Sequence, residues 1–411
     1  MKSHSAESIA GTHPSAPDGW RVDNFERLAV LQRGFDLPSS ARTTGDVPII
    51  GSNGIVGWHS EARVHGPGVV TGRSGSIGES TYVEGDYWPL NTSLYVSHFH
   101  DNIPRFVHYF IQWFDLSRFA SGVSVPTLNR NAVYGTEVKI PSPTEQEKIA
   151  AVLWKLQRAI ATQHRLIAAT RDLKQSAMHR LFTQGLRGES LKETKIGSMP
   201  ESWRIESFVN VARLERGRFT HRPRNEPRFY GGNTPFVQTG DVVRGQGQIT
   251  TYTQTLNTDG VAISRVFPTG TILITIAANI GFTGILNFDS ACPDSLVGIT
   301  PRDFMSGQFL AYYLQLQQPE MDRQAPKGTQ KNINLQFLEP WPVAVPGLEE
   351  QREIAAALTT IDRKLAHHQK KRAALNDLFQ TLLHKLMTGE IRVAEIDIDT
   401  SEITAPPGAT A

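Results

Sequence analysis

The chain has 411 residues, 39% of them hydrophobic and 20% charged, which is too many for one compact core and suits two or more domains. Its formal net charge of +2 is too small to indicate nucleic-acid binding by itself. The single cysteine, Cys292, excludes an intramolecular disulfide, and no apolar run approaches the roughly 18 residues of a membrane span. Because the polar start also lacks a signal-peptide apolar region, we expect a cytoplasmic protein with no membrane partner.

A first globular region is predicted at residues 18–141, after a disordered tail at 1–17. Short runs of β-forming residues alternate there with glycine-rich turns, which is typical of strands. We expect these strands at 47–50, 68–70 and 93–96. Aromatic residues at helical spacing predict an amphipathic helix between Ile103 and Phe119.

A glycine-rich segment, Gly72 to Gly78, lies inside this first region. It is not followed by the long helix that a dinucleotide-binding fold requires. Two interpretations stay open: a tight turn, or a loop that lets Arg73 and Ser74 approach DNA.

A long helix is predicted at residues 142–187, with Pro143-Thr144 and Glu145 as its start and Gly185 as its stop. Taking every third and fourth residue gives a heptad seam, although its middle is polar. The seam consists of Ile149, Leu153, Leu156, Ile160, Gln163, Ile167, Thr170, Lys174, Ala177 and Leu181.

Residues 188–346 are predicted to form a second globule of the same mixed character. Apolar runs indicate strands at Val237, at Val242-Val243 and at 271–276. Phe309 to Gln317 has helical spacing and matches the amphipathic helix of the first globule.

An arginine-rich segment from Arg213 to Arg228 lies near the start of the second globule, and lysine is missing from it. Guanidinium groups suit bidentate recognition of guanine edges or phosphates. The candidate DNA-binding residues here are Arg216, Arg218, Arg222 and Arg224. A solvated basic loop remains the alternative, because the prolines and glycine predict a loop in either case.

A second candidate segment carries small, amide and cationic side chains on a turn, with the weaker counterpart Ser121 to Ser124 in the first globule. Its candidate residues are Lys327, Thr329, Lys331 and Asn332. Such side chains fit contacts in a DNA groove and fit a plain connector equally well.

A second long helix is predicted at residues 347–392, followed by a tail at 393–411. Its seam is more apolar, and its polar step, His368, aligns with Gln163 of the first helix. The seam consists of Ile354, Leu358, Ile361, Leu365, His368, Arg372, Leu375, Phe379, Leu382 and Leu386.

The two halves of the chain repeat one another. Residues 145–151 return at 350–356, and the register holds without a gap to Leu181 and Leu386, always 205 residues on. Unrelated surface helices would not keep such a register across about 40 residues. We therefore expect an α+β protein in which two pseudo-symmetric mixed α/β globules are joined by two long helices, paired as an antiparallel intramolecular coiled coil.

No catalytic constellation, phosphate-binding loop or metal-ligand spacing is found in the sequence. Glu145-x-Glu147-Lys148 superficially resembles a nuclease triplet, but its position in the first turn of a repeated helix favours ordinary charged residues. We expect no covalent chemistry and no bound metal. The net charges of residues 18–141 (10 basic, 12 acidic) and 198–346 (13 basic, 12 acidic) are −2 and +1. We therefore expect the basic residues to lie strongly on one side and other subunits to help hold a DNA backbone.

From residue 18 to 392 the chain resembles the specificity subunit of type I restriction–modification systems. The resemblance rests on the two helix openings (Pro141 to Gln146, Pro346 to Gln351), the two helix ends (Leu181 to Thr183, Leu386 to Glu390), the Trp-Arg-aliphatic signatures at Trp20 and Trp203, and Pro235 to Asp241. It implies two target-recognition domains, each reading half of a bipartite sequence in double-stranded DNA. The helices would set the distance between the halves.

The resemblance also implies partners. Two methyltransferase subunits that bind S-adenosylmethionine and methylate adenine would dock on the helical frame, and two restriction subunits that use ATP and Mg²⁺ can join them. The residues expected in the coiled coil and in subunit docking are Ile149, Leu153, Leu156, Ile160, Ile354, Leu358, Ile361, Leu365, Leu382 and Leu386. This chain itself would bind no cofactor and would not be an enzyme.

Two other classes compete with this hypothesis. A structural scaffold or adaptor whose duplicated globules bind protein would show no DNA sequence preference. An enzyme would need an active site that the sequence does not reveal.

Overall fold

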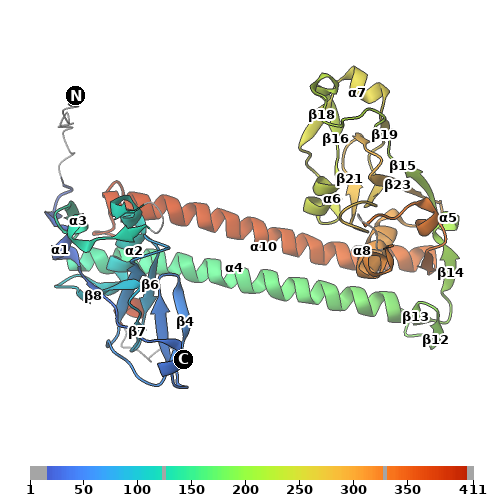
Figure 1. The fold of residues 1–411 in the computed structure, drawn as a ribbon. Helices are drawn as coiled ribbons and strands as arrows, with labels where there is room; N and C mark the ends of the chain where they lie inside the picture. Colours follow the sequence, from blue (N-terminus) through green and yellow to red (C-terminus); the bar gives the residue numbers. More distant parts are fainter. Residues whose placement is uncertain (1–15, 123–125, 327–330, 405–411) are drawn as a thin grey trace. The chain divides into compact units, whose positions relative to one another are not determined.

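The computed structural model describes residues 16–122, 126–326 and 331–404. It divides into two compact units, of which unit 1 comprises residues 1–164 and 370–411 and unit 2 comprises Arg165–Gln369. Each unit therefore contains one globule and one half of each long helix (Figure 1).

The two long helices are α4 (Pro143–Gln184, 42 residues) and α10 (Leu348–Thr388, 41 residues), drawn in green and orange-red in Figure 1. Both are followed by a glycine with positive φ, Gly185 at 62° and Gly389 at 78°, the left-handed conformation that commonly ends a helix. The long helices expected from the heptad pattern are confirmed. Within the described residues, no helix has the length and apolarity to cross a bilayer.

The globule of unit 1 contains two larger β-sheets, ordered β2-β8-β5-β6 and β4-β3-β7. The helix α2 (Pro104–Phe114) packs on the larger sheet through buried aromatic side chains. The sheet strands are β2 (Val30–Arg33), β3 (Val47–Gly51), β4 (Gly54–His59), β5 (Gly68–Gly72), β6 (Ser80–Val83), β7 (Trp88–Pro89) and β8 (Ser93–His98). Smaller elements are α1 (Phe25–Leu28), η1 (Ser39–Ala41), η2 (Leu116–Phe119), the paired β9 (Ala120–Ser121) and β10 (Thr127–Leu128), and α3 (Arg130–Tyr134).

The globule of unit 2 has the same plan, with sheets ordered β15-β23-β20-β21-β17 and β18-β16-β22-β19. Here α8 (Gly307–Gln324) packs on the larger sheet. The sheet strands are β15 (Ala212–Arg216), β16 (Tyr230–Phe236), β17 (Gln248–Ile249), β18 (Gln254–Leu256), β19 (Arg265–Phe267), β20 (Ile272–Thr275), β21 (Thr283–Leu286), β22 (Ser290–Cys292) and β23 (Leu296–Pro301). Smaller elements are the hairpin β12 (Leu191–Thr194) and β13 (Gly197–Pro200), α5 (Phe208–Val211), η3 (Pro227–Phe229), α6 (Thr239–Gly245), α7 (Thr258–Ala262) and α9 (Leu335–Leu338).

In each unit the strand that follows the repeated tryptophan pairs with the last strand of the globule. In unit 1, β1 (Arg21–Asn24) runs antiparallel to β11 (Glu137–Ile140), and in unit 2, β14 (Arg204–Ser207) runs antiparallel to β24 (Pro342–Val345). Because β11 and β24 lead directly into α4 and α10, this pairing fixes each globule to the beginning of a long helix.

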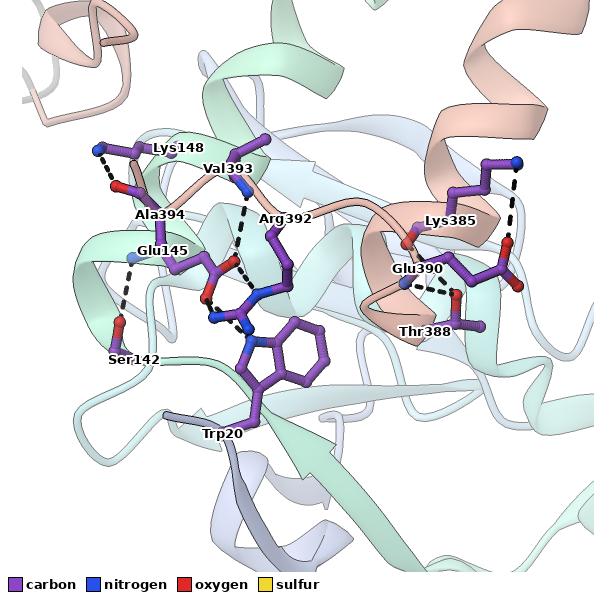
Figure 2. A network of polar contacts seen from close by, with 10 residues as sticks. All are labelled: Trp20, Ser142, Glu145, Lys148, Lys385, Thr388, Glu390, Arg392, Val393 and Ala394. Carbon is purple, nitrogen blue, oxygen red and sulfur yellow. Dashed lines mark hydrogen bonds and ion pairs between the residues drawn. The ribbon is translucent and has the colours of Figure 1, made fainter. Parts of the chain in front are cut away.

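A buried carboxylate fastens the tryptophan before β1 to α4 in unit 1 (Figure 2). Trp20 Nε1 donates a 2.9 Å hydrogen bond to Glu145, whose side chain is 2% exposed. Arg392, just past α10, donates two hydrogen bonds of 2.8 Å to the same carboxylate, and the Val393 amide adds one of 3.4 Å. We call Trp20, Glu145 and Arg392 the clasp of unit 1.

The same arrangement recurs in unit 2, where Trp203 Nε1 donates a 3.1 Å hydrogen bond to the buried Glu350. The amide of Leu186, just past α4, donates to the other carboxylate oxygen at 2.7 Å. The duplication therefore extends from sequence to individual hydrogen bonds.

The neighbouring glutamines are also equivalent. Gln146 Nε2 donates to Pro141 O at 3.0 Å while its Oε1 accepts from the Ile103 amide at 2.9 Å. Gln351 Nε2 donates to Pro346 O at 2.9 Å while its Oε1 accepts from an amide of unit 2 at 2.7 Å. The repeated Glu-Gln pair thus connects the first turn of each long helix to its globule.

Within each unit, the halves of α4 and α10 run antiparallel. In unit 1, Glu145 contacts Arg392, just past the end of α10. Further along α4, Gln157 accepts a hydrogen bond from the Tyr109 hydroxyl, and the Tyr109 ring packs on Phe379, earlier in α10. In unit 2, Lys174 meets Asp362 at 2.7 Å, while the amide just after α4 meets Glu350, near the start of α10.

Lys174, a charged residue in the heptad seam of α4, forms an ion pair with Asp362. Its ammonium lies 2.7 Å from Asp362 and 5.2 Å from the ring centroid of Tyr312, whose hydroxyl donates to Asp362 at 2.7 Å. Unit 1 has an uncharged equivalent in which the Tyr109 hydroxyl donates to Gln157 at 2.6 Å and Phe379 packs on the ring.

This pairing predicts a compensating double substitution. K174F alone leaves Asp362 half-buried without its cation, and we expect a loss of about 1.5–3 kcal/mol in the free energy of unfolding. Adding D362Q reproduces the residues of unit 1 and should recover most of that loss. Urea denaturation of the two single variants and the double variant measures the coupling; additive losses would contradict the prediction.

Two parts of the chain differ from expectation. Val242-Val243, predicted as a strand, belongs to α6, because Gln238 and Asp241 form a capping box that starts a helix there. Val237 likewise lies outside any strand. Of residues 393–411, expected as a tail, the described part packs on the globule of unit 1 through Val393, Ile398 and the short helix α11 (Ser401–Thr404).

Candidate nucleic-acid interface

The arginine-rich segment of unit 2 begins at the end of β15. Arg216 is the last residue of that strand, and the chain then turns at Gly217, where any side chain would lie 2.1 Å from Pro293 O. Only glycine fits this close approach between two backbones. The segment that follows contains no regular element until η3.

Asp294 organises three of the four candidate arginines. Its backbone oxygen accepts a 2.7 Å hydrogen bond from Arg216 Nε, and its carboxylate accepts one of 2.8 Å from Arg222 Nη2. Arg224 Nη2 donates to the other carboxylate oxygen. The guanidinium groups are thereby held in place by one acid, while the side chains of Arg222 and Arg224 stay 51% and 45% exposed.

The fourth candidate, Arg218, has a different environment. Its guanidinium donates at 3.0 Å to Ser264 O, and its amide donates at 2.9 Å to Cys292 O. These contacts connect the segment to the smaller sheet.

A hollow of about 520 Å³ brings the two candidate segments of unit 2 together. Arg216, Arg224 and Asn332 all line it, beside Asp294 and Asn334. Lys331 forms an ion pair with Asp322 at 2.8 Å. Lys327 and Thr329 lie outside the described residues.

A backbone bridge shapes the rim of this hollow. Ala277, just after β20, pairs with Asn332, and the Ile333 amide donates to Ile276 O at 2.9 Å. Ala278 follows with φ of 65°, a left-handed conformation that costs a non-glycine residue about 1–2 kcal/mol. Strain of this kind is found preferentially at functional sites.

Unit 1 contains the equivalent bridge. Ser74, just after β5, pairs with Thr127, and the Leu128 amide donates to Arg73 O at 2.8 Å. Thr127 and Asn332 are 205 residues apart, as are the repeated helices. The segment at Gly72 is a tight turn, because a side chain there would lie 1.9 Å from Ser76 O; Arg73 and Ser74 are half-buried in it.

Two residues at these sites were missed in the sequence. No sequence pattern marks Asp294 as a site residue, because about 70 residues separate it from the arginines that it binds. Arg33 had a signal: Leu31-Gln32-Arg33-Gly34 returns as Leu214-Glu215-Arg216-Gly217, 183 residues on, the spacing that also relates Trp20 to Trp203. Arg33 is exposed at the end of β2, as Arg216 is at the end of β15.

The residues expected in both the coiled coil and subunit docking are buried or half-buried within the units. Ile149, Leu153, Ile354 and Leu358 are fully buried and Leu386 is 1% exposed. The others, Leu156, Ile160, Ile361, Leu365 and Leu382, are half-buried. A partner would therefore meet other faces of these helices.

The first residue of the nuclease-like triplet Glu145-x-Glu147-Lys148 has a structural role. Burial raises the pKa of the Glu145 carboxyl, but the hydrogen bonds from Arg392 and Trp20 outweigh burial and lower the pKa below its ordinary value. Lys148 donates at 2.5 Å to Ala394 O, near the clasp (Figure 2). In the described part of the chain, no three His, Cys, Asp or Glu side chains gather where they could hold a metal ion.

The chain thus consists of two similar mixed globules and two long helices, with an arginine-lined hollow in the globule of unit 2. The model of the type I restriction modification DNA specificity domain matches the chain twice, at residues 17–170 and 200–377. The chain belongs to this family and is a type I restriction–modification specificity subunit with two recognition domains.

Two relatives are similar to this chain over about two thirds of its length or more. The MjaX type I restriction enzyme specificity subunit of Methanocaldococcus jannaschii is 26% identical over 297 residues, which is 71% of this chain and 68% of the relative. The MjaVIII specificity subunit of the same organism is 23% identical and covers 67% of each chain.

Two solved structures share the fold. The type I S subunit of M. genitalium has a TM-score of 0.64 at 15% identity and covers 92% of this chain and 98% of its own. A chain from a study of complex assembly in the type I R-M system has a TM-score of 0.58 at 21% identity and covers 92% and 100%. The expected α+β fold class, with two domains and two long helices, is confirmed.

Proposed function

We propose that each unit reads one half of a bipartite sequence in double-stranded DNA and that this chain performs no covalent chemistry. The observation that carries the proposal is the repeated bridge beside an arginine-glycine strand end, present in both units. In unit 2 this bridge forms the rim of the arginine-lined hollow. Arginine and asparagine side chains placed in this way suit bidentate contacts with guanine and adenine edges.

The charge of the globules supports a role for partners. Their net charges of −2 and +1 (10 basic against 12 acidic, and 13 against 12) are too small for tight phosphate neutralisation, which supplies most non-specific affinity for DNA. We infer that two methyltransferase subunits, which bind S-adenosylmethionine, supply the remaining contacts with the DNA backbone. Restriction subunits that use ATP and Mg²⁺ would join them where the system cleaves DNA.

Mapping of methylated adenine in genomic DNA tests this function. With the chain present, methylation is expected at every copy of one sequence made of two specified parts separated by an unspecified gap. Deletion of its gene should remove that methylation entirely. Methylation that persists without the chain, or that follows a single uninterrupted sequence, would refute the proposal.

We expect the long helices to set the length of that gap. Deleting Ala159 to Thr162 shortens α4 by about 6 Å, and the tolerated gap should change by on the order of two base pairs, at about 3.4 Å each. The control, I160A/T162A, keeps the helix length and should keep the gap. The same mapping measures both variants; an unaltered gap in the deletion variant would show that the helices do not set it.

A further inference from the structure

The larger sheet of unit 2 contains a buried hydroxyl group that has no partner. Thr283 lies on β21 and is only 4% exposed. Its hydroxyl oxygen forms no hydrogen bond within the part of the chain that the structure describes. A buried polar group of this kind is unfavourable and rare in native proteins. Thr283 lines a cavity of about 260 Å³, so the hydroxyl is placed where a ligand could reach it.

The duplication identifies the equivalent of Thr283 in unit 1. In the antiparallel ladders, Ser80 pairs with Thr71 and Thr283 pairs with Ile274. Thr71 and Ile274 each lie three residues before the first residue of the backbone bridge described above for their unit. Ser80 and Thr283 therefore occupy the same position in the two larger sheets.

In unit 1 this hydroxyl contacts an imidazole ring. Ser80 Oγ lies 2.8 Å from Nδ1 of the buried His108 on α2. Burial lowers the pKa of the His108 imidazole to about 3, so the ring is neutral at physiological pH. Ala311 is the equivalent residue on α8, because both residues directly precede the tyrosine whose hydroxyl donates to a long helix. The hydroxyl of Thr283 thus lacks the nitrogen heterocycle that its counterpart contacts.

Neighbouring positions in unit 2 also carry smaller side chains. In unit 1 the guanidinium of Arg105 packs between Tyr82 and Trp154, 4.0 Å and 4.1 Å from the two ring centroids. The same positions in unit 2 as Arg105 and Trp154 hold Gln308 and Thr359. These two residues line a second cavity of about 540 Å³. Unit 2 therefore has open space where unit 1 is filled by its own side chains.

The two cavities are adjacent, since Lys174 and Gln246 line both of them. Together they have the size of an ordinary small-molecule site. A cavity of about 150 Å³ already accepts benzene, so the smaller cavity has room for a purine ring. Val242 and Phe282 give it apolar walls against which such a ring can pack.

Glutamine side chains provide the polar contacts of the smaller cavity. Gln315 and Gln318 follow Ala311 by four and seven residues, so all three lie on one face of α8. Gln315 rests on Gly247, where φ is 104° and a Cβ would lie 2.7 Å from Gln315 Nε2. A glutamine amide both donates and accepts, and it matches the N6 and N7 atoms of adenine.

The larger cavity carries a positive charge in excess. Its charged lining residues are Lys174, Asp362 and Arg363. Because Lys174 pairs with Asp362 at 2.7 Å, the exposed Arg363 supplies the excess charge. A phosphate group suits an arginine at this position, since the guanidinium can donate two parallel hydrogen bonds to it.

We propose that unit 2 binds a purine nucleotide in these two cavities, with the base beside Thr283 and the phosphate beside Arg363. The base supplies the nitrogen heterocycle that unit 1 carries as His108. The residues that line these cavities differ from those that line the arginine-lined hollow. This site is therefore separate from the proposed DNA interface and does not depend on it.

Titration of adenosine monophosphate into the full-length chain, followed by isothermal calorimetry, tests the proposal. We expect one saturable site and a Tm that rises with the nucleotide concentration, because the ligand stabilises the folded state. T283V removes the hydroxyl and should weaken binding about fivefold, the usual effect of losing one hydrogen bond. T283S introduces the residue of unit 1 and should retain most of the affinity.

Two further variants test the two ends of the nucleotide. A311H introduces the imidazole of unit 1, so it should abolish binding without lowering the Tm, because Thr283 then gains a partner. R363A should weaken the binding of adenosine monophosphate and leave the binding of adenosine unchanged, since only the former carries a phosphate. Gln317 lies on α8 and lines neither cavity, so Q317A is the matched control and should bind as the wild type does.

The competing outcomes are distinct. A wild-type chain without saturable binding would overturn the proposal, as would T283V and R363A variants that bind with unchanged affinity. S-adenosylmethionine carries the same base with a sulfonium cation in place of the phosphate and should bind more weakly; tighter binding would refute the phosphate contact. R216A/R224A should bind the nucleotide normally, whereas a loss there would assign the nucleotide to the arginine-lined hollow.

Discussion

R216A/R224A is expected to abolish recognition of one half of the DNA target while the other half is still read. Both side chains line the hollow of unit 2, and each guanidinium lost should cost about 1–3 kcal/mol of discrimination. The combined loss corresponds to about 30-fold or more in specific affinity. Competition with duplexes scrambled in one half or the other, using the complex with the methyltransferase, measures the effect for each half separately.

R213A is the matched control for this prediction. Arg213 lies on β15 near Arg216, but it forms an ion pair with Glu215 at 2.9 Å and does not line the hollow. Removal of this arginine should weaken binding slightly and equally for all sequences, because it removes only one positive charge. Equal losses in R213A and R216A/R224A would show that the segment contributes charge and not sequence recognition.

Asp294 offers a second, counterintuitive test of the same site. D294A removes a negative charge beside the arginines, so non-specific affinity for DNA should increase. It also releases Arg222 and Arg224 from their fixed positions, so discrimination between correct and scrambled half-sites should fall. A variant that gains affinity and keeps full discrimination would show that Asp294 does not position the arginines.

E145A is expected to open the clasp of unit 1. It leaves Trp20 Nε1 without its acceptor and Arg392 without its carboxylate. Removing one member of a buried ion pair costs about 3–5 kcal/mol, and the lower end applies because the Arg392 side chain is 33% exposed. Hydrogen exchange at β1 and β11 should accelerate, while β14 and β24 of unit 2 keep their protection.

The pH dependence of the clasp follows from the lowered pKa of Glu145. A carboxyl whose pKa is lower in the folded state stabilises the fold above its unfolded value of 4.5, and this contribution disappears as the pH falls below that value. E145Q keeps an acceptor for Trp20 without the charge, so it should restore part of the stability and flatten the acid dependence. E147A, two residues away, should change neither exchange nor acid dependence.

Much of the architecture was predictable because it depends on periodicity and repetition. The heptad seams located α4 and α10, and the constant spacing of 205 residues identified the duplication. The prediction of a strand at Val242-Val243 is wrong, because two adjacent apolar residues cannot distinguish the periodicity of a strand from that of a helix. The hydrogen bond from the Gln238 amide to Asp241 at 2.9 Å caps a helix that begins there.

The candidate interface was only partly predictable. Composition predicts both the arginine-rich segment and Asn332 as candidate sites, but about 110 residues separate them in sequence, and only the fold brings them to one hollow. Local composition cannot reveal Asp294 as their organiser, because its role depends on the turn between β22 and β23. Arg33 could have been found by applying the spacing of the repeated tryptophans to the arginine-glycine pair.

The unequal seams have a consequence for how such chains can recombine. The first half of the chain supplies Lys174 to a site that needs Asp362, and the second half supplies Phe379 to a site that needs Gln157. Two copies of the first half would set Lys174 against Gln157, and two copies of the second half would set Phe379 against Asp362. Self-association of identical half-chains therefore leaves a half-buried charge without its counter-ion at both sites, which favours the union of unlike halves.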